Sequence, residues 1–198
     1  MNMLIAALAF LGVSSTAAPI VGSTAPDFTG TTTNGETISL SQFENQKVIL
    51  EWSNHGCPYV QKHYNSGNMQ SVQKRTTAEG VVWITIISSA PGEQGYVNAA
   101  EADDLTHTRK AAPTYVVLDP EGDIGRLYAA KTTPHMFLID EDQTLQYAGA
   151  IDSIPTANVN DIARAENFVM AAFRSLQNGQ AVVTKQSQPY GCAVKYAS

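Results

Sequence analysis

Short, continuously hydrophobic runs recur along the chain, and more polar stretches of helical length separate them. Such runs are typical of β-strands covered on both faces of a sheet. We therefore expect buried strands at 48–52, 81–87, 115–118 and 136–139. A fifth run, 145–151, alternates more and predicts a strand that pairs with the fourth in an antiparallel hairpin. Near the N-terminus, Asn34-Gly35 predicts a two-residue hairpin turn.

The stretches between these strands predict helices at 58–64, 69–77, 98–110 and 158–177, with an interruption near 65–68. The last is the clearest, because hydrophobic residues from Val159 to Leu176 follow one face and Gly179 is placed to end it. Strands that alternate with helices predict βαβ units, hence an α/β domain with a mostly parallel sheet and right-handed crossovers. We expect the tail, 181–198, to be irregular or to add one short strand.

The first eighteen residues differ from the rest of the chain. Residues 4–13 are a short apolar run, and small residues follow as far as Ala18. This pattern is typical of a secretory signal peptide cleaved after Ala17 or Ala18, although it lacks a basic start. The alternative is a buried N-terminal helix; the run is too short to span a bilayer, which takes roughly 20 residues. We expect a signal peptide at 1–18, one domain at 19–198, and a periplasmic or secreted protein.

The amino-acid composition bears on which classes of binding partner the protein has. The chain has 198 residues, 43% of them hydrophobic and 15% charged, which describes an ordinary globular domain. Its net charge of −6 argues against nucleic acid and against anionic membrane surfaces. No other stretch is apolar enough to cross a bilayer, so we expect no membrane association once the signal peptide is removed.

Cys57 is the residue that carries most of the chemical information. It follows the strand at 48–52 directly after Gly56, and Pro58 comes next. Proline is favoured at the first position of a helix, which makes Cys57 the predicted N-cap. Free backbone N–H groups and the helix dipole favour a thiolate there, and the thiolate is the nucleophile. The alternative is a buried structural cysteine. His55 and Lys62 would add positive charge only if they faced the thiol; otherwise they are solvated surface residues.

Cys192 is the other cysteine, and an even count in an oxidising compartment suggests a disulfide. The two cysteines are so far apart in the sequence that only tertiary folding can bring them together. By elimination, Cys192 is the only candidate to resolve an oxidised Cys57. His63, His107 and His135 are metal ligands in principle, but no characteristic spacing supports this, and we expect no metal or organic cofactor. On local sequence alone Pro134 is a trans proline, because only about 5–6% of X–Pro bonds are cis.

Taken together, these features resemble the redoxin branch of the thioredoxin superfamily, the group that contains alkyl hydroperoxide reductase/thiol-specific antioxidant proteins. The resemblance is closest to exported, peroxiredoxin-like members. The matching segments cover nearly the whole chain after the signal peptide: 25–28, 56–70, 88–95, 125–140, 147–152 and 189–196. It implies a thioredoxin-like α/β fold, with a central mixed β-sheet flanked by helices and an N-terminal β-hairpin extension. It also implies that Thr133-Pro134 is a cis-proline loop that faces Cys57 and can pair with an extended segment of a partner.

The chain departs from the family pattern at three positions. Val60 stands where a CxxC motif has its second cysteine, so no local dithiol exists. Asn54 stands where a typical peroxiredoxin has Thr or Ser, and Pro134 stands where it has an arginine. Those two groups activate peroxide, so the departures argue against fast peroxidase turnover. The predicted thiol environment comprises Asn54, His55, Gly56, Pro58, Thr133, Pro134 and His135.

These observations predict an exported thiol oxidoreductase. Cys57 attacks a hydroperoxide oxygen or a disulfide sulfur, Cys192 resolves the product as a Cys57–Cys192 disulfide, and an external thiol reductant reopens it. The competing hypothesis is a redox-inert domain with a permanent Cys57–Cys192 disulfide. A variant of that hypothesis is a copper(I)-handling protein that binds the ion through Cys57 and His135.

Overall fold

The computed structural model describes residues 18–197. The predicted signal peptide therefore lies outside the described residues, apart from Ala18. Within them, no helix combines the length and the apolar character that crossing a bilayer requires.

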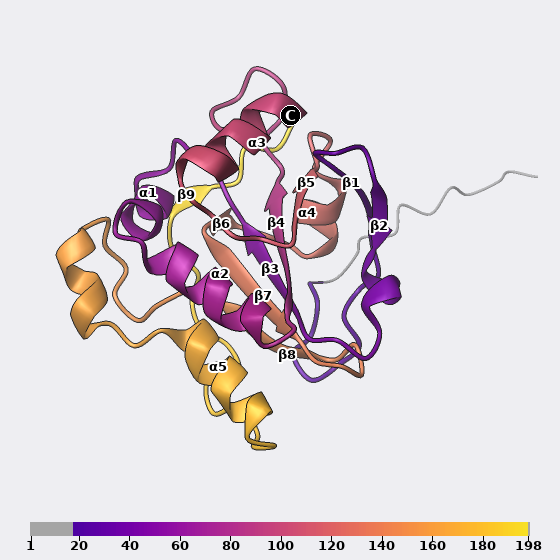
Figure 1. Cartoon of the computed structure of the whole chain (residues 1–198), viewed down its shortest axis with the longest axis vertical. Coiled ribbons are helices and arrows are strands. Elements are labelled where there is room, and N and C mark those ends of the chain that lie inside the picture. The colour runs from indigo at the N-terminus through magenta and orange to yellow at the C-terminus, as the bar shows by residue number, and fades with distance from the viewer. Residues whose placement is uncertain (1–17, 198) are drawn as a thin grey trace, which may run out of the picture.

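A central sheet of seven strands organises the molecule, in the order β2-β1-β5-β4-β3-β7-β8 (Figure 1). Only the β3–β4 and β4–β5 pairs are parallel. The sheet is mixed, as the family resemblance implies, and the expectation of a mostly parallel sheet is wrong because an antiparallel hairpin flanks each side. The strands are β1 Thr29–Thr32, β2 Thr37–Ser39, β3 Val48–Trp52, β4 Val82–Ile87, β5 Tyr115–Leu118, β7 His135–Ile139 and β8 Leu145–Gly149.

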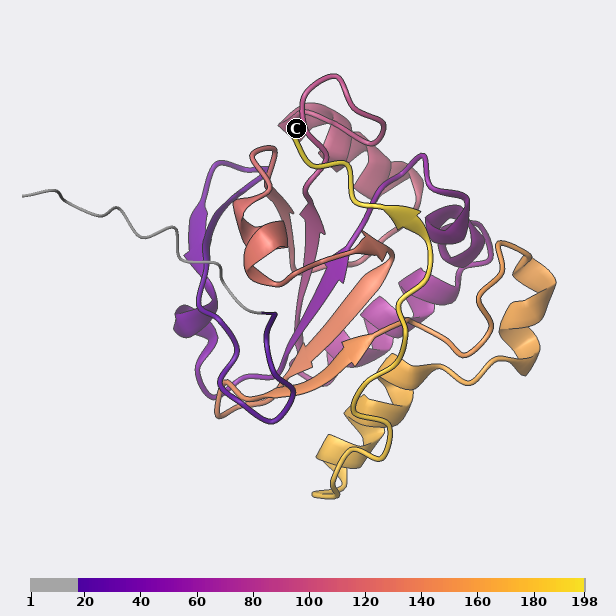
Figure 2. The ribbon, with the colours of Figure 1, turned by 180° about the vertical axis from the view of Figure 1, so that it is seen from behind.

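Helices cover both faces of this sheet and enclose two large hydrophobic cores, besides a small cluster of Val97, Ala102 and Val116 at α3. One core lies under α1, α2 and α5, and the other lies between the sheet, α4 and the N-terminal segment. Figure 1 shows α2 and α5 in front of the sheet, and Figure 2 shows α4 on the opposite side. The helices are α1 Pro58–Asn65, α2 Asn68–Ala78, α3 Ala99–Thr108, α4 Asp123–Leu127 and α5 Phe168–Gln177, with 3-10 turns η1 Leu40–Phe43 and η2 Val159–Arg164.

The predicted hairpins form, although the first differs in its turn. Residues Thr31 and Thr37 pair across β1 and β2, so the turn around Asn34-Gly35 is longer than two residues. Gly35 has φ +82°, a left-handed conformation that glycine adopts without steric cost. The β7–β8 hairpin is confirmed.

The single helix predicted at 158–177 is wrong. The chain forms η2, then an extended segment at 165–167, and only then α5. Asn158 caps η2 through its side chain, and Asn167 caps α5 by accepting a hydrogen bond from the Met170 N–H at 2.9 Å. The extended segment pairs with residues near Asp152, because the Phe168 N–H donates to the Ile151 carbonyl and the Ser153 N–H donates to the Glu166 carbonyl, each at 3.0 Å.

A small second sheet forms beside the main one. Strand β6 (Thr132–Thr133) pairs antiparallel with β9 (Cys192–Ala193). The expected short strand in the C-terminal tail is therefore confirmed. Residues 186–197, which we call the C-terminal strap, cross the molecule in Figure 2 from the side of α5 to the end where α3 and α4 lie.

Candidate functional site

Cys57 occupies the junction between β3 and α1. All five residues of β3 are buried, so the sheet fixes the point from which the turn to α1 leaves. Cys57 is the N-cap, with extended backbone angles (φ −78°, ψ 124°), and Pro58 is the first helical residue, as predicted. The Cys57 N–H donates to the Asn54 carbonyl at 3.0 Å, which closes the turn.

Asn54 braces this turn. Its Oδ1 accepts from the Gly56 N–H at 2.9 Å, and its Nδ2 donates to the Gln94 carbonyl at 3.0 Å. Gly95 allows this contact, because it has φ +91° and a Cβ there would lie 2.3 Å from Cγ of Asn54. Asn54 therefore connects the turn that carries Cys57 to the loop after β4. The sequence predicted only that Asn54 lies near the thiol.

The Thr133–Pro134 peptide bond is cis and faces Cys57. The Cys57 thiol donates to the Thr133 carbonyl oxygen, with 3.1 Å between sulfur and oxygen. The trans proline expected from local sequence is wrong, and the cis-proline loop implied by the family resemblance is present. The sulfur and this loop therefore form one site.

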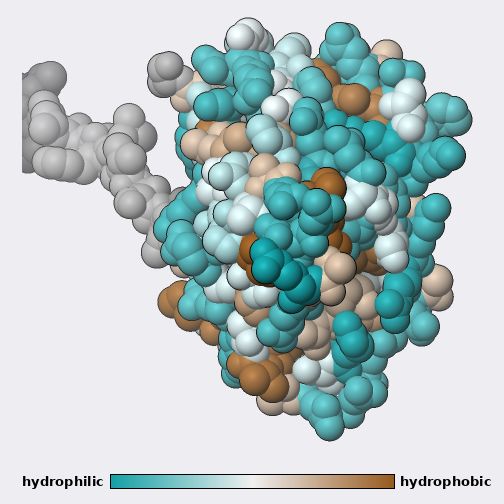
Figure 3. Space-filling view, turned by 90° about the vertical axis from the view of Figure 1, so that its left-hand side faces the viewer, coloured by the Kyte–Doolittle hydropathy of each residue, from teal (hydrophilic) through white to brown (hydrophobic). Residues whose placement is uncertain are grey.

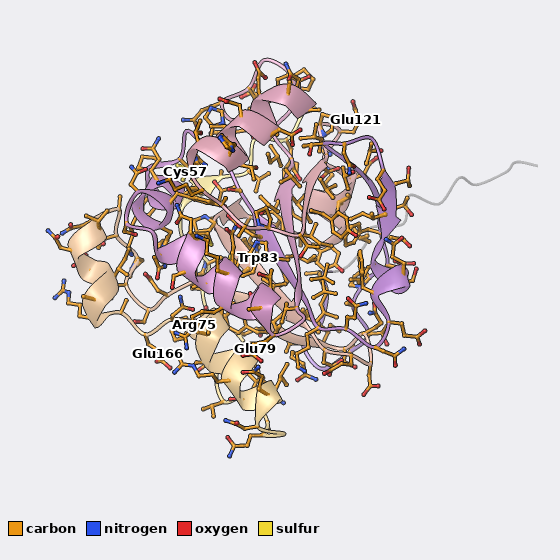
Figure 4. All side chains as sticks on the ribbon, in the orientation of Figure 1. Cys57, Arg75, Glu79, Trp83, Glu121 and Glu166 are labelled. Carbon is orange, nitrogen blue, oxygen red and sulfur yellow. The ribbon has the colours of Figure 1, made fainter. Side chains whose placement is uncertain are left out.

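Strand β9 brings Cys192 to the same loop. Cys192 pairs with Thr133, and Gly191 lets the two backbones approach, because a Cβ at Gly191 would lie 2.0 Å from the Thr133 oxygen. Cys57 itself is 0% exposed, so the sulfur is buried as in the alternative of a structural cysteine, but it lies against the cis-proline loop. Figure 4 shows Cys57 at the start of α1, beside the ribbon of β9. Both cysteines are free thiols, unlike the permanent disulfide of the competing hypothesis.

The two thiols differ in acidity. Burial raises the pKa of Cys57, but hydrogen bonds from Cys192, the Val60 backbone and Thr133 outweigh it, so the pKa lies below its ordinary value. Burial raises the pKa of Cys192 to about 11, and the hydrogen bond between Cys192 and Cys57 raises it in the same direction. Cys192 thus acts as a proton donor to a Cys57 thiolate, and the pair is polarised toward Cys57 as the nucleophile.

His135 does not belong to the thiol environment, contrary to prediction. Successive residues of a strand face opposite sides of the sheet, and Met136 takes the side that packs in one core with Cys57. The His135 ring lies on the other face, 4.4 Å between centroids from Phe137, and its Nδ1 accepts from the Lys131 N–H at 3.3 Å. Burial lowers its pKa to about 3. A copper(I) ion shared by Cys57 and His135 does not fit this placement.

Neither His55 nor Lys62 supplies the positive charge that would act on Cys57 if it faced the thiol. The His55 carbonyl accepts from Arg109 Nη2 at 3.2 Å and from Gln61 Nε2 at 3.1 Å. Burial and the charge of Arg109 lower the pKa of the His55 ring. Lys62 is buried instead of solvated, and its ammonium pairs with Asp152 at 3.0 Å. The acidity of Cys57 therefore comes from neutral hydrogen-bond donors.

Sequence reasoning missed a polar cluster beside α1, formed by the buried Lys62, His63 and Asp152 and the half-buried Tyr190. The one available signal was Tyr190-Gly191-Cys192, which puts an aromatic residue two positions before a cysteine. Within residues 18–197, no three His, Cys, Asp or Glu side chains are grouped in a way that could hold a metal ion.

A thiol at the N-cap of the first main helix, opposite a cis-proline loop, defines a thioredoxin-fold protein of the redoxin class. The comparisons specify the family: the AhpC/TSA family matches residues 21–148, and the chain belongs to it. A comparison with curated proteins finds no significant match.

Solved structures agree on the fold. A hypothetical protein from Sinorhizobium meliloti superposes with a TM-score of 0.76 at 19% identity, covering 92% of this chain and 97% of its own. An uncharacterized conserved protein from Geobacillus kaustophilus gives 0.75 at 20% identity, covering 90% and 93%. A putative thiol:disulfide interchange protein DsbE from Chlorobium tepidum gives 0.52 at 23% identity, covering 65% and 84%. At these identities the likeness establishes the thioredoxin-like fold.

Proposed function

We propose that the protein is a thiol oxidoreductase that cycles between a Cys57/Cys192 dithiol and a Cys57–Cys192 disulfide. The observation that carries this proposal is the pairing of Cys192 with Thr133, directly across the cis-proline loop from the acidic Cys57. Membership of the AhpC/TSA family supports the same class of chemistry.

The cycle balances with a disulfide as substrate. The Cys57 thiolate attacks one sulfur, forms a mixed disulfide and expels the other sulfur as a thiolate. Cys192 gives up its proton and attacks the Cys57 sulfur, which forms the internal disulfide and releases the second substrate thiol. Two electrons have then moved from the protein to the substrate, and an external thiol reductant returns them.

A disulfide is favoured over a hydroperoxide by what contacts the sulfur. The hydrogen-bond partners of Cys57 are Thr133, Cys192 and the Val60 backbone, all uncharged. Lys62 binds Asp152 and Arg109 binds the His55 carbonyl, while the charge of Lys195 acts on the pKa of Cys192 and not on that of Cys57. A peroxide O–O bond is activated by a positive charge beside the sulfur, and this site offers neutral donors in its place.

We place this activity in the periplasm or outside the cell. The supporting observation is the apolar run at 4–13 with its small-residue end at Ala18. N-terminal sequencing of the protein recovered from a secreting host tests this, and we expect a new terminus at Ala18 or Pro19. A retained Met1 in the recovered protein would contradict export.

Two cysteine variants test the cycle. We expect Cys57→Ser to abolish reduction of insulin disulfides, and Cys192→Ser to accumulate a mixed disulfide with the substrate, detected by intact mass. Parallel assays with hydrogen peroxide compare the two substrate classes, and we expect the disulfide to react faster. Normal turnover by Cys57→Ser would refute the assignment of the nucleophile.

A further inference from the structure

The C-terminal strap, which covers the nucleophile, is fastened on both sides of Cys192. Before the cysteine, the Ser187 N–H donates to the Ala148 carbonyl at 3.2 Å, next to the end of β8. After it, the Ala90 N–H donates to the Lys195 carbonyl at 2.8 Å, and Tyr196 OH donates to the Ala130 carbonyl at 2.8 Å. Because Cys57 is 0% exposed beneath this strap, the strap must move before a substrate sulfur reaches it.

Tyr190 is the strap residue that enters a buried charged site. Its hydroxyl accepts from Lys62 Nζ at 3.2 Å and donates to Asp152 Oδ1, and His63 Nε2 lies 3.4 Å away. Its ring packs edge-on against Tyr59, with the centroids 5.7 Å apart. Helix α1 lies on the side of the molecule that Figure 3 shows, where the surface is mostly hydrophilic and hydrophobic residues form only small groups.

The socket that receives Tyr190 is also held together by hydrogen bonds in which Tyr190 takes no part. Lys62 also donates to Asp152 Oδ2 and to the Ile154 carbonyl, each at 3.0 Å. The Ile154 N–H donates to Asp152 Oδ1 at 3.0 Å. The buried cation and carboxylate are therefore held by α1 and by the loop after β8, and the tyrosine hydroxyl is the one partner that arrives on the strap.

The geometry connects this socket to the reacting sulfurs. Lys62 lies on the helix that Cys57 caps, five residues further along, or about 7.5 Å at the rise of an α-helix. Tyr190 lies two residues before Cys192, and its ring packs on Tyr59, which like Cys192 borders the hydrophobic core that contains Cys57. A hydroxyl seated between Lys62 and Asp152 thus fixes where Cys192 stands relative to Cys57.

We propose that Tyr190 is a positioning residue for the thiol cycle: seated between Lys62 and Asp152, it holds Cys192 over Cys57, and its release uncovers Cys57 for the substrate. This rests on the proposed dithiol cycle. Removing the hydroxyl destabilises the state in which the strap covers Cys57. Substrates and alkylating agents then reach Cys57 faster, and the internal disulfide forms less readily. A general loss of structure would not produce these two opposite effects.

The test compares Tyr190→Phe with Tyr59→Phe, which removes the same atom from the neighbouring ring. The first readout is the alkylation rate of Cys57 by iodoacetamide in a Cys192→Ser background. The second is the equilibrium between the internal disulfide and glutathione in the protein with both cysteines. For Tyr190→Phe we expect alkylation to rise, and the effective concentration of the disulfide to fall, each by about tenfold, the size of a hydrogen bond to a charged group. For Tyr59→Phe we expect neither to change.

The outcomes separate this proposal from the function on which it rests. Equal values for Tyr190→Phe and wild type in both readouts would overturn the positioning role, as would equal effects of the two variants. If the wild type forms no internal disulfide in the glutathione buffer, the dithiol cycle is refuted. The alkylation arm then decides alone whether Tyr190 holds the strap over Cys57.

Discussion

At the scale of single residues, the chemistry depends on how a buried sulfur is kept acidic. Burial opposes the thiolate of Cys57, and only hydrogen bonds to the anion reverse that effect. Thr133 acts in opposite directions: its carbonyl accepts from the thiol and so favours the neutral form, whereas its buried hydroxyl, which has no hydrogen-bond partner in the described structure, lowers the pKa of Cys57 by donating to the thiolate. A hydroxyl in that position gains a partner when Cys57 ionises.

We therefore expect Thr133→Val, which keeps the side-chain shape, to raise the pKa of Cys57. Alkylation at neutral pH should slow by about fivefold, the effect of one hydrogen bond of about 1 kcal/mol. The pH dependence of iodoacetamide modification, read at the Cys57 peptide by mass spectrometry, measures the shift. Thr132→Val is the matched control, because its hydroxyl bonds to the Pro134 carbonyl. An unchanged pH profile for Thr133→Val would show that the hydroxyl does not stabilise the thiolate.

At the scale of secondary structure, the sequence predicted what local pattern decides. The buried strands at 48–52 and 115–118 and the N-cap at Cys57 follow from hydrophobic runs and from Pro58. The break at 165–167 was missed because hydrophobic positions before and after it keep a helical period. Tertiary hydrogen bonds impose the break, because residues 166–168 bond to the loop that carries Asp152. The same loop forms part of the socket for Tyr190.

Asn167 marks where α5 restarts, so its cap should contribute to stability. We expect Asn167→Ala to lower the free energy of unfolding by about 1 kcal/mol, because the Met170 N–H loses its acceptor. Asn167→Ser, which can still cap, should recover most of the loss. Urea denaturation followed by far-UV circular dichroism gives both values. If alanine and serine unfold at the same urea concentration, the cap does not stabilise the break.

At the scale of the whole molecule, the position of the strap could not be read from the sequence. Cys192 was identified as the partner of Cys57 by elimination, but the strand that carries it pairs over only two residues. The sequence also did not reveal which face of the sheet each side chain takes: His135 was predicted to belong to the thiol environment, yet strand alternation turns its ring to the other core. Residues distant in sequence decide both placements, and composition and periodicity do not report them.

The two buried histidines on opposite faces of the sheet make the fold sensitive to acid. Burial lowers the pKa of His63 to about 4 and that of His135 to about 3, below the ordinary 6.5. As the pH falls below 6.5, the unfolded chain takes up protons that the folded chain refuses, so this contribution to stability is complete above pH 6.5 and is lost toward pH 4. Linkage sets the loss by pH 4 at about 3 kcal/mol for each histidine.

The variant His135→Asn isolates one of these contributions, since its side-chain oxygen can replace Nδ1 as the acceptor for the Lys131 N–H. Chemical denaturation at a series of pH values between 7 and 4 should show the wild type losing stability more steeply than the variant. The two curves should converge as the pH falls, because only the wild type has a proton to exclude at this position. Parallel curves across the whole range would mean that the His135 ring takes up a proton as readily in the folded protein as in the unfolded chain.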